Sequence, residues 1–223
     1  MLKTARGRDL KTGRRRDRAT EGGPRRGGTA ERLRGAAVEL FSRHGFDGVS
    51  VRDIAGHAGV NKGLVFYHFE TKAKLFACLI DDYYEAYSRV LAASLAIEGS
   101  QAERIHQLLD ANLDFIEENL DYVRIVQLEI GLGSETLPRI RQGIEVLYDA
   151  VAEVMKGVSP AKGPLSARHF FVSLSGMVNT YFLYASAIEP FWGSDPLSVR
   201  ERRERREHLH WMLDAIVGQI LAT

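Results

Sequence analysis

Residues 29–74 read TAERLRGAAVELFSRHGFDGVSVRDIAGHAGVNKGLVFYHFETKAK, and this stretch decides the fold because it predicts three short helices in close succession. In the first of them, Leu33, Ala37 and Phe41 recur at helical spacing and form one apolar stripe. The last helix brings basic and aromatic residues together. This order of elements is the outline of a DNA-binding unit.

The second and third helices have clear start signals. Ser50 and Asp53 have the spacing of a capping box, in which the serine reaches forward and the acid reaches back. Asn61 is placed to cap the third helix, which leaves only Gly59 and Val60 as the turn between the two helices. Helices joined by so short a turn must cross at a steep angle. The side chains expected to fill the wedge between them are Ile54, Val60, Val65 and Phe66.

These residues resemble the DNA-binding domain of the tetracycline-repressor (TetR) family of transcription regulators. The resemblance covers about a fifth of the chain. Leu64 and Phe66 depart from the family pattern, which often has Thr or Ser at the first position and Tyr at the second. The matching runs are Ser50-Val51-Arg52-Asp53-Ile54-Ala55, Ala58-Gly59-Val60-Asn61-Lys62-Gly63 and Tyr67-His68-Phe69-Glu70-Thr71-Lys72.

The resemblance implies a set of DNA contacts. Residues at the start of a recognition helix meet base edges in the major groove, so Lys62 and Leu64 are the candidates for base contact. Tyr67 and His68 would reach phosphates, although Tyr67 could equally be a packing residue and His68 a structural hydrogen-bonding residue. The predicted DNA-binding residues are Ser50, Asn61, Lys62, Gly63, Leu64, Tyr67, His68, Thr71 and Lys72.

Residues 1–28 differ in composition from the rest of the chain. Ten Lys or Arg against three acids give this segment a net charge of +7, and because the whole chain carries +1, the remainder carries −6. Six glycines and no aromatic residue leave it little apolar surface to bury, so we expect a disordered basic arm. Such an arm could track DNA phosphates or be a solvated leader without a role in binding.

Length and composition bound the remaining possibilities. A chain of 223 residues with 45% hydrophobic content can hold a reading domain at 29–75 and a larger domain at 76–223. One cysteine, Cys78, excludes an intramolecular disulfide and fits a cytoplasmic protein. No apolar stretch follows the basic N-terminus, so no signal peptide is expected. The uncharged run at 170–188 reaches the lower length limit of a membrane span, but its Ser, Gly and Asn residues favour a buried helix.

The larger domain is predicted to be helical throughout, giving an all-α chain of about nine helices. The expected helices are 72–96, 103–119, 122–130, 137–154, one around 170–185, and a last one from 199, whose first part is nearly all charged and whose second part carries an apolar stripe. By resemblance, two helices near the C-terminus form the interface of a homodimer. The alternative is that both are core helices of one subunit. The predicted interface residues are Phe170, Leu174, Val178, Leu209, Met212, Leu213, Ile216 and Ile220.

By the same resemblance, a small molecule binds in the larger domain and changes the spacing of the two readers. Few charges occur in these segments, so we expect an apolar, aromatic-tolerant effector and no cofactor. Each candidate taken alone could be plain core. The predicted ligand-binding residues are Phe115, Leu128, Tyr148, Met177, Tyr181, Tyr184 and Trp192.

The sequence does not predict an enzyme. No Gly-rich phosphate loop occurs, and His208 and His210 lie on different faces of a helix, which is poor spacing for metal ligands. We therefore expect a dimeric regulator that binds a palindromic double-stranded operator, most simply a repressor released by an effector. The alternative is a helical sensor or adaptor that binds a protein partner through the C-terminal stripe. The surface from Asn61 to Lys72 favours the regulator, because an adaptor has no need to keep it basic.

Overall fold

A computed structural model describes residues 28–221, with side chains through Gln219. The predicted all-α class is confirmed, since this part of the chain contains nine helices and no strand. The predicted arm at residues 1–27 and the side chain of Ile220 lie outside the described residues. The helices are α1 (Thr29–His44), α2 (Val51–His57), α3 (Lys62–Phe69), α4 (Lys72–Leu95), α5 (Gln101–Glu118), α6 (Leu120–Leu132), α7 (Leu137–Val154), α8 (Ala167–Trp192) and α9 (Val199–Leu221).

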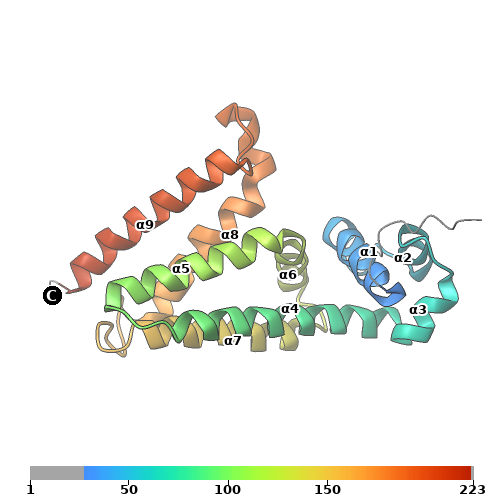
Figure 1. Cartoon of the computed structure of the whole chain (residues 1–223), viewed down its shortest axis with the longest axis horizontal. Helices are drawn as coiled ribbons and strands as arrows, with labels where there is room; N and C mark the ends of the chain where they lie inside the picture. The colour runs from blue at the N-terminus through green and yellow to red at the C-terminus, as the bar shows by residue number, and fades with distance from the viewer. Residues whose placement is uncertain (1–27, 222–223) are drawn as a thin grey trace, which may run out of the picture.

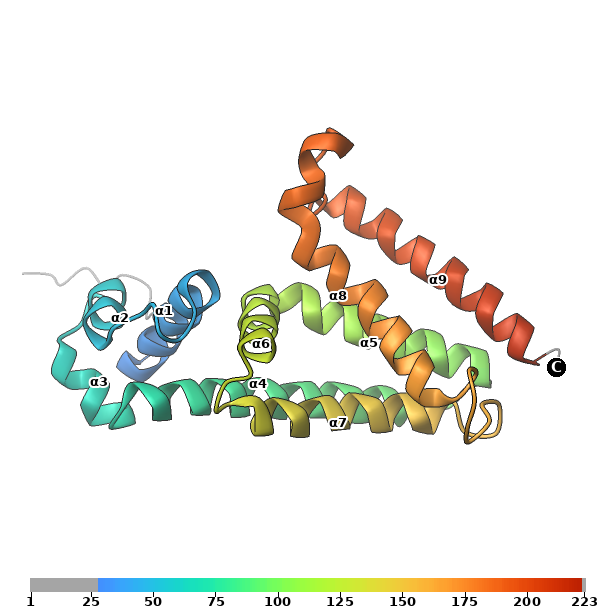
Figure 2. The ribbon, with the colours of Figure 1, turned by 180° about the vertical axis from the view of Figure 1, so that it is seen from behind.

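Helix α4 runs from one end of the molecule toward the other and connects the helices at both ends. Figure 1 shows α1, α2 and α3 gathered at one end of α4, while α5 and α7 lie along its other part. Seen from behind in Figure 2, α8 rises from the end remote from α1–α3, and α9 runs back toward that end. The predicted division between residues 75 and 76 falls inside α4, which runs through it without a break.

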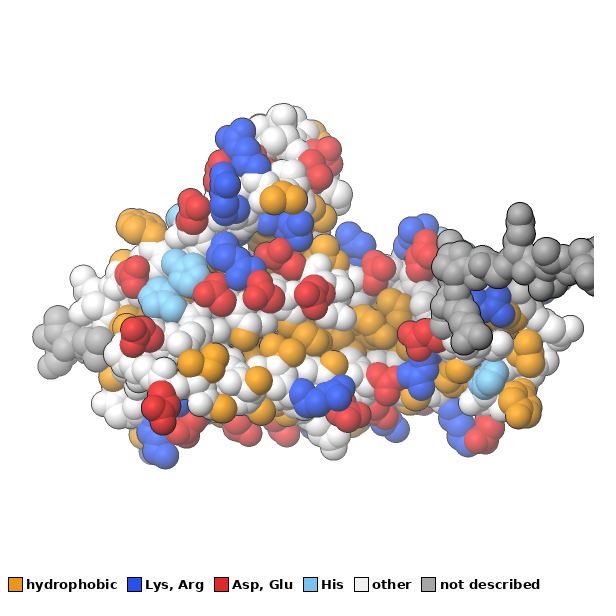
Figure 3. Space-filling view, viewed as in Figure 1, with side chains coloured by type: hydrophobic (Ala, Val, Ile, Leu, Met, Phe, Trp, Pro, Cys, Tyr) orange, Lys and Arg blue, Asp and Glu red, His pale blue; other side chains and the backbone are white. Residues whose placement is uncertain are grey.

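The sequence of α4 explains how one helix serves both ends. Its side chains recur at three- and four-residue spacing, so an apolar stripe follows the helix for most of its length. Leu75, Phe76 and Leu79 are buried near the three-helix end, and Tyr87 and Leu91 are buried beyond the middle. On the face shown in Figure 3, hydrophobic side chains form a band where α5 meets α4.

The charged first part of α9 is tied to α5 by ion pairs. Arg202 donates to Glu117 over 3.0 Å, and Arg206 donates to both Asp110 and Asp114. Further along, His210 Nε2 lies 2.8 Å from Asp110. This charge run, which in sequence has the composition of a solvated surface, therefore fixes α9 against α5 and lets the apolar stripe that follows pack inward.

Helix α8 is long and apolar enough to cross a membrane by length and composition alone. A core helix of a water-soluble protein passes the same test. Five of its residues are buried by packing within the chain, namely Leu174, Val178, Tyr181, Phe182 and Ala185. The loop after α8 is also tied back to the helix, because the Tyr181 hydroxyl donates to the carbonyl of Pro196.

Helix α7 approaches a side chain of α4 closely at Gly143. A Cβ atom added at this position would lie 2.0 Å from Cδ1 and 2.3 Å from Cγ of Tyr84. Both distances are far below a van der Waals contact, and Cγ is close to the backbone, so the ring cannot simply swing away. Glycine at 143 is thus required for α7 to lie across the ring of Tyr84.

We expect Gly143→Ala to lower the free energy of unfolding by about 1–3 kcal/mol, because the added methyl group overpacks the α4–α7 contact. Chemical denaturation followed by circular dichroism measures the change. Gly35→Ala is the matched control, since Gly35 is an exposed helical glycine with no atom within 4 Å of an added Cβ. The control should stabilise the protein by about 0.5–1 kcal/mol. Equal effects of the two substitutions would contradict the packing argument.

Candidate nucleic-acid interface and effector cavity

The turn between α2 and α3 is built as the sequence predicts. The capping box is present, with Asp53 N donating to Ser50 Oγ over 3.2 Å and Ser50 N donating to Asp53 Oδ2 over 2.9 Å. Asn61 Oδ1 accepts from Gly63 N at 2.8 Å and starts α3. Gly59 has φ +64°, a left-handed conformation that glycine adopts without strain. These caps fix the angle at which α3 leaves the turn.

The cap at Ser50 uses the groups that the sequence assigned to a phosphate. The Ser50 hydroxyl donates to Asp53 Oδ2 over 2.6 Å while accepting from the Asp53 backbone. Hydrogen bonds from the side chain and then the backbone of Ser50 hold the pKa of Asp53 below its ordinary value. A phosphate would have to compete with this carboxylate for the hydroxyl, so the contact predicted for Ser50 stays a prediction.

Helix α3 presents a solvent-facing surface of mixed chemistry, which we call the α3 face: Lys62, Gly63, Phe66, Tyr67 and His68. Tyr67 is 79% exposed, so it is free to contact a partner and is not a packing residue in this chain. Leu64 is half-buried, whereas Val65 and Phe69 form the buried side of the helix.

The position predicted for Phe66 is wrong. It was expected to fill the wedge between α2 and α3, but it is 45% exposed, and the Lys62 ammonium lies 5.7 Å from its ring centroid. Val65 fills the buried side of α3 at this point, and Phe66 faces outward because neighbouring residues on a helix point in different directions. The four-residue spacing from Lys62 could have placed Phe66 on the outer face.

Lys72 also has a different role from the predicted one. Its ammonium donates to the carbonyls of Phe46 and Val49 at 2.8 and 2.9 Å, and it lies 4.0 Å from the centroid of the Phe46 ring. The side chain therefore ties the start of α4 to the loop between α1 and α2. The DNA contact predicted for Lys72 is therefore corrected to this internal one. Thr71 accepts from Lys74 N as the cap of α4, and its hydroxyl hydrogen stays available.

We expect Lys72→Met to lower the free energy of unfolding by about 2–3 kcal/mol, because two carbonyls lose a charged donor while the aliphatic stem is kept. Lys74→Met removes the same charge from an exposed side chain that pairs with Glu70, and it should cost at most about 1 kcal/mol. Thermal and denaturant unfolding of the two variants make the comparison. A Lys72→Met protein as stable as Lys74→Met would contradict the assigned role.

Four of the eight predicted dimer-interface residues are buried within the chain. Leu174, Val178, Leu209 and Leu213 are buried, so they cannot form the outer surface of a dimer, and this part of the prediction is wrong. Their helices pack against other helices of the same subunit, which is the alternative that the sequence left open.

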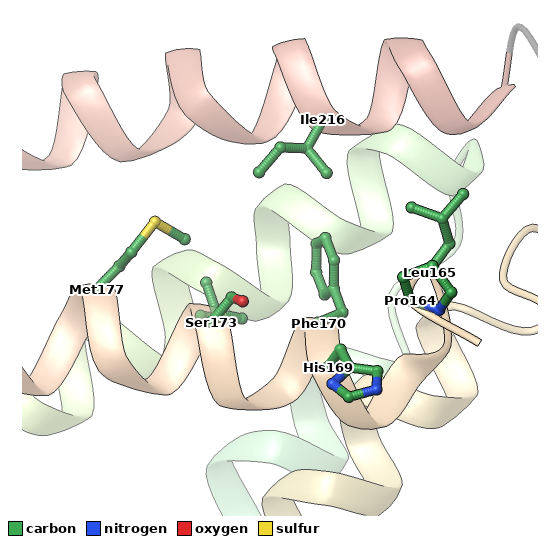
Figure 4. Close-up of a pocket in the computed structure, with 8 residues that line it drawn as sticks. Pro164, Leu165, His169, Phe170, Ser173, Met177 and Ile216 are labelled. Carbon is green, nitrogen blue, oxygen red and sulfur yellow. The ribbon is translucent and has the colours of Figure 1, made fainter. Parts of the chain in front are cut away.

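The remaining predicted interface residues are more accessible. Figure 4 shows Phe170 on α8 and Ile216 on α9 pointing toward each other across a pocket of about 150 Å³. Both are half-buried, as is Met212. The most exposed aromatic side chains on these helices include Tyr184 on α8, at 60%, and Trp211 on α9, at 66%.

The seven predicted ligand-binding residues do not come together. Phe115 and Tyr181 are buried, while Leu128, Tyr148, Tyr184 and Trp192 are exposed in different places. Met177 lines the pocket between α8 and α9 in Figure 4. Phe115 stacks on Tyr87 with ring centroids 4.7 Å apart, and it lines a different pocket between α4 and α5. The predicted set is therefore corrected, because spacing along helices does not show which faces meet.

A cavity of about 530 Å³ lies instead among α4, α5, α6, α7 and α8. This volume is within the range of small-molecule sites. Gly143 lies in its wall, where α7 crosses Tyr84. The residues that line the cavity are Tyr83, Tyr84, Tyr87, Asn112, Ile116, Val123, Val126, Gln127, Ile130, Gly143, Ile144, Leu147, Phe171, Val172, Ser175 and Asn179.

The cavity lining carries polar groups but no charge. Burial raises the pKa values of Tyr83, Tyr84 and Tyr87, so these phenols stay protonated near neutral pH. The Tyr87 hydroxyl donates to Oδ1 of Asn112, which is itself buried. Apolar side chains of α6, α7 and α8 complete the wall. Among the described residues, no group of three or more His, Cys, Asp or Glu side chains could hold a metal ion.

Comparison with known proteins adds the family context. Residues 33–79 match the family "Bacterial regulatory proteins, tetR family". The chain is 34% identical to the probable HTH-type transcriptional regulator YttP of Bacillus subtilis over 50% of this chain, an alignment that spans only 55% of that protein. It is 30% identical to the HTH-type transcriptional regulator CymR of Pseudomonas putida, over 60% of this chain and 67% of CymR.

The fold is also similar to solved structures. The ketosteroid transcriptional regulator KstR2 of Mycobacterium tuberculosis superposes with a TM-score of 0.68, covering 86% of this chain and 94% of KstR2. At 17% identity this likeness concerns the fold alone.

Proposed function

Because this chain belongs to the tetR family of bacterial regulatory proteins, we propose that it regulates transcription as a homodimer bound to a palindromic DNA operator. Residues 29–75 would read the DNA, and residues 76–223 would bind the effector and form the dimer. A protein of this kind acts in the cytoplasm. The single observation that carries the proposal is the α3 face, which is exposed, uncrowded and held at a fixed angle by caps on both sides of the turn.

The α3 face suits the major groove in both shape and chemistry. Lys62 is at the N-terminal end of the helix, where a recognition helix meets base edges, and its ammonium can donate to guanine O6 and N7. Gly63 removes a side chain where the backbone comes close to the DNA. Tyr67 and His68 lie about one turn further on, at the distance of the phosphate backbone. Phe66 offers an apolar contact, which suits a thymine methyl group.

A dimer accounts for how so small a surface would select an operator. One α3 helix reads only half a site, and a two-fold axis places the second about 34–36 Å away, one turn of DNA further. We place this axis beside the outer sides of α8 and α9, which carry Tyr184 and Trp211. The interface is therefore assigned to outward side chains and not to the buried leucines of the sequence prediction.

Release by an effector would act through α4. Tyr83 lines the cavity, and the next residue toward the N-terminus, Asp82, pairs with Arg34 of α1. The guanidinium of Arg34 also lies 5.7 Å from the ring centroid of Phe69, at the end of α3. A ligand that moves the tyrosines would thus move α1 and α3. Ligand and operator then prefer different spacings of the two readers, and each weakens the binding of the other by the same factor.

The proposed action is that of a repressor released from its operator. The sensor or adaptor alternative has less support, because Leu209, Leu213 and Val217 of the apolar stripe on which it depended are buried within the chain. An adaptor would also leave the capped, exposed α3 face without a role.

We expect Lys62→Ala to weaken operator binding roughly tenfold to a hundredfold and to relax the preference at one base pair of each half-site. Tyr67→Phe removes only a hydroxyl, and it should weaken binding to all sequences by up to about tenfold. Selection from a random duplex pool, followed by fluorescence anisotropy on the selected DNA, measures both effects.

Lys156→Ala is the matched control for charge. It removes one exposed lysine beyond the end of α7, far from α3, and should leave affinity and base preference unchanged. If wild type selects no palindrome at moderate salt, the proposed function is wrong. If Lys62→Ala and Lys156→Ala lose affinity equally, the assignment of the α3 face is wrong.

We expect Tyr184→Glu and Trp211→Glu each to convert the dimer to monomer at micromolar concentration, because each buries a carboxylate at the axis. Sedimentation velocity measures the association state, and operator binding should fall in parallel. The control is Leu132→Glu, which changes a 71% exposed leucine that ends α6 and belongs to neither α8 nor α9. If Leu132→Glu alone produced monomers, the assignment of the interface to α8 and α9 would be wrong.

A further inference from the structure

The cavity among α4–α8 is notable for the charges that it lacks. All sixteen lining residues are uncharged at neutral pH, although about a quarter of the chain is charged. Other pockets of this protein do carry charge, since Asp110, Asp114 and Glu118 line the pocket between α4 and α5. The neutrality is thus a local property of this cavity.

The polar groups of the cavity are arranged as hydrogen-bond donors. Asn112 is 2% exposed, and its carbonyl oxygen accepts from Tyr87, so its two amide hydrogens have no partner among the described residues. The hydroxyls of Tyr83 and Tyr84 likewise make no hydrogen bond there, yet both side chains reach the cavity. These donors belong to side chains that line the cavity, so an acceptor bound there can take hydrogen bonds from them.

A charged ligand would not be stabilised in this cavity. Moving a carboxylate, phosphate or ammonium out of water is costly unless an opposite charge meets it. No Lys, Arg or His lines the cavity to meet an anion, and no Asp or Glu lines it to meet a cation. The side chains of Ile144 and Leu147 offer only dispersion contacts to the rest of the molecule.

Building on the function proposed above, we infer that the effector is an uncharged, largely apolar molecule whose neutral carbonyl or ester oxygen accepts hydrogen bonds from Asn112 and the α4 tyrosines. Its body fills the apolar part of the cavity against α6, α7 and α8. An effector whose charged group must enter the cavity is excluded by the same geometry.

The test uses matched probes that differ only in charge. One series is methyl dodecanoate, dodecanoate and dodecylamine, and the other is methyl biphenyl-4-carboxylate, biphenyl-4-carboxylate and 4-biphenylmethylamine. Each is titrated by calorimetry, below its aggregation threshold, into the full chain without DNA. In at least one series we expect the ester to bind roughly a hundredfold more tightly than its charged partners, because each ion loses hydration that no opposite charge in the cavity replaces.

Two substitutions tie this preference to the cavity. Asn112→Asp keeps the shape of the side chain and its bond from Tyr87 but adds a negative charge, so it should favour the amine. Gln127→Lys adds a positive charge from α6 and should favour the carboxylate. Ser175→Trp fills the cavity and should abolish ester binding. Circular dichroism checks that each variant is folded, and at least one folded charge variant is needed for the comparison.

The outcomes separate the inference from the function on which it rests. Equal binding of ester and carboxylate to wild type, binding of no ester, or an ester bound equally by Ser175→Trp and wild type would each overturn the inference. An unchanged order of affinities in the folded charge variants would overturn it as well. Operator binding is measured separately by anisotropy. A protein that prefers the ester but selects no operator would retain the inferred ligand class while the proposed function fails.

Discussion

The continuous apolar stripe of α4 is the constraint on which the rest of the structure depends. One straight helix is packed at its start by α1 and α3 and along its later turns by α5 and α7. Because the helix is unbroken, a displacement of its middle turns is carried to the three-helix end without a flexible linker to absorb it. The cavity borders those middle turns, at Tyr83, Tyr84 and Tyr87. The position of the cavity thus follows from the same helix that positions α3.

Aromatic packing beside the cavity joins α4 to both α5 and α6. Tyr83 stacks on Tyr122 of α6 with centroids 4.9 Å apart, and Tyr87 stacks on Phe115 of α5 at 4.7 Å. Stacked ring pairs of this kind contribute beyond the apolar area that they bury, so they join α4 firmly to α5 and α6. Gly143 lets α7 close the cavity over the ring of Tyr84. Any ligand in this space therefore contacts the rings that connect three helices.

The charged side chains of α5 do not line the cavity and instead pair with α9. The acids of α5 face α9 and bind its arginines, so the polar side of α5 fixes the C-terminal helix while another side of α5 supplies Asn112 to the cavity. The fixed position of α9 in turn buries Leu209 and Leu213 and leaves Trp211 outside. Ion pairs on one side of α5 thus determine which residues of α9 a second subunit can reach.

The sequence by itself determined the elements with local causes: the helical class, the caps at Ser50, Asn61 and Thr71, and the short turn between α2 and α3. Each depends on residues within a few positions of one another, which is the range that spacing reports. Only the tertiary structure decided which faces meet. It turned Lys72 inward onto the carbonyls of Phe46 and Val49, left Phe66 outside, buried Leu209 and Leu213 of α9 within the chain, and placed the cavity at residues that no spacing singled out. Those outcomes depend on contacts between helices far apart in sequence, where many pairings of apolar faces are compatible with one pattern.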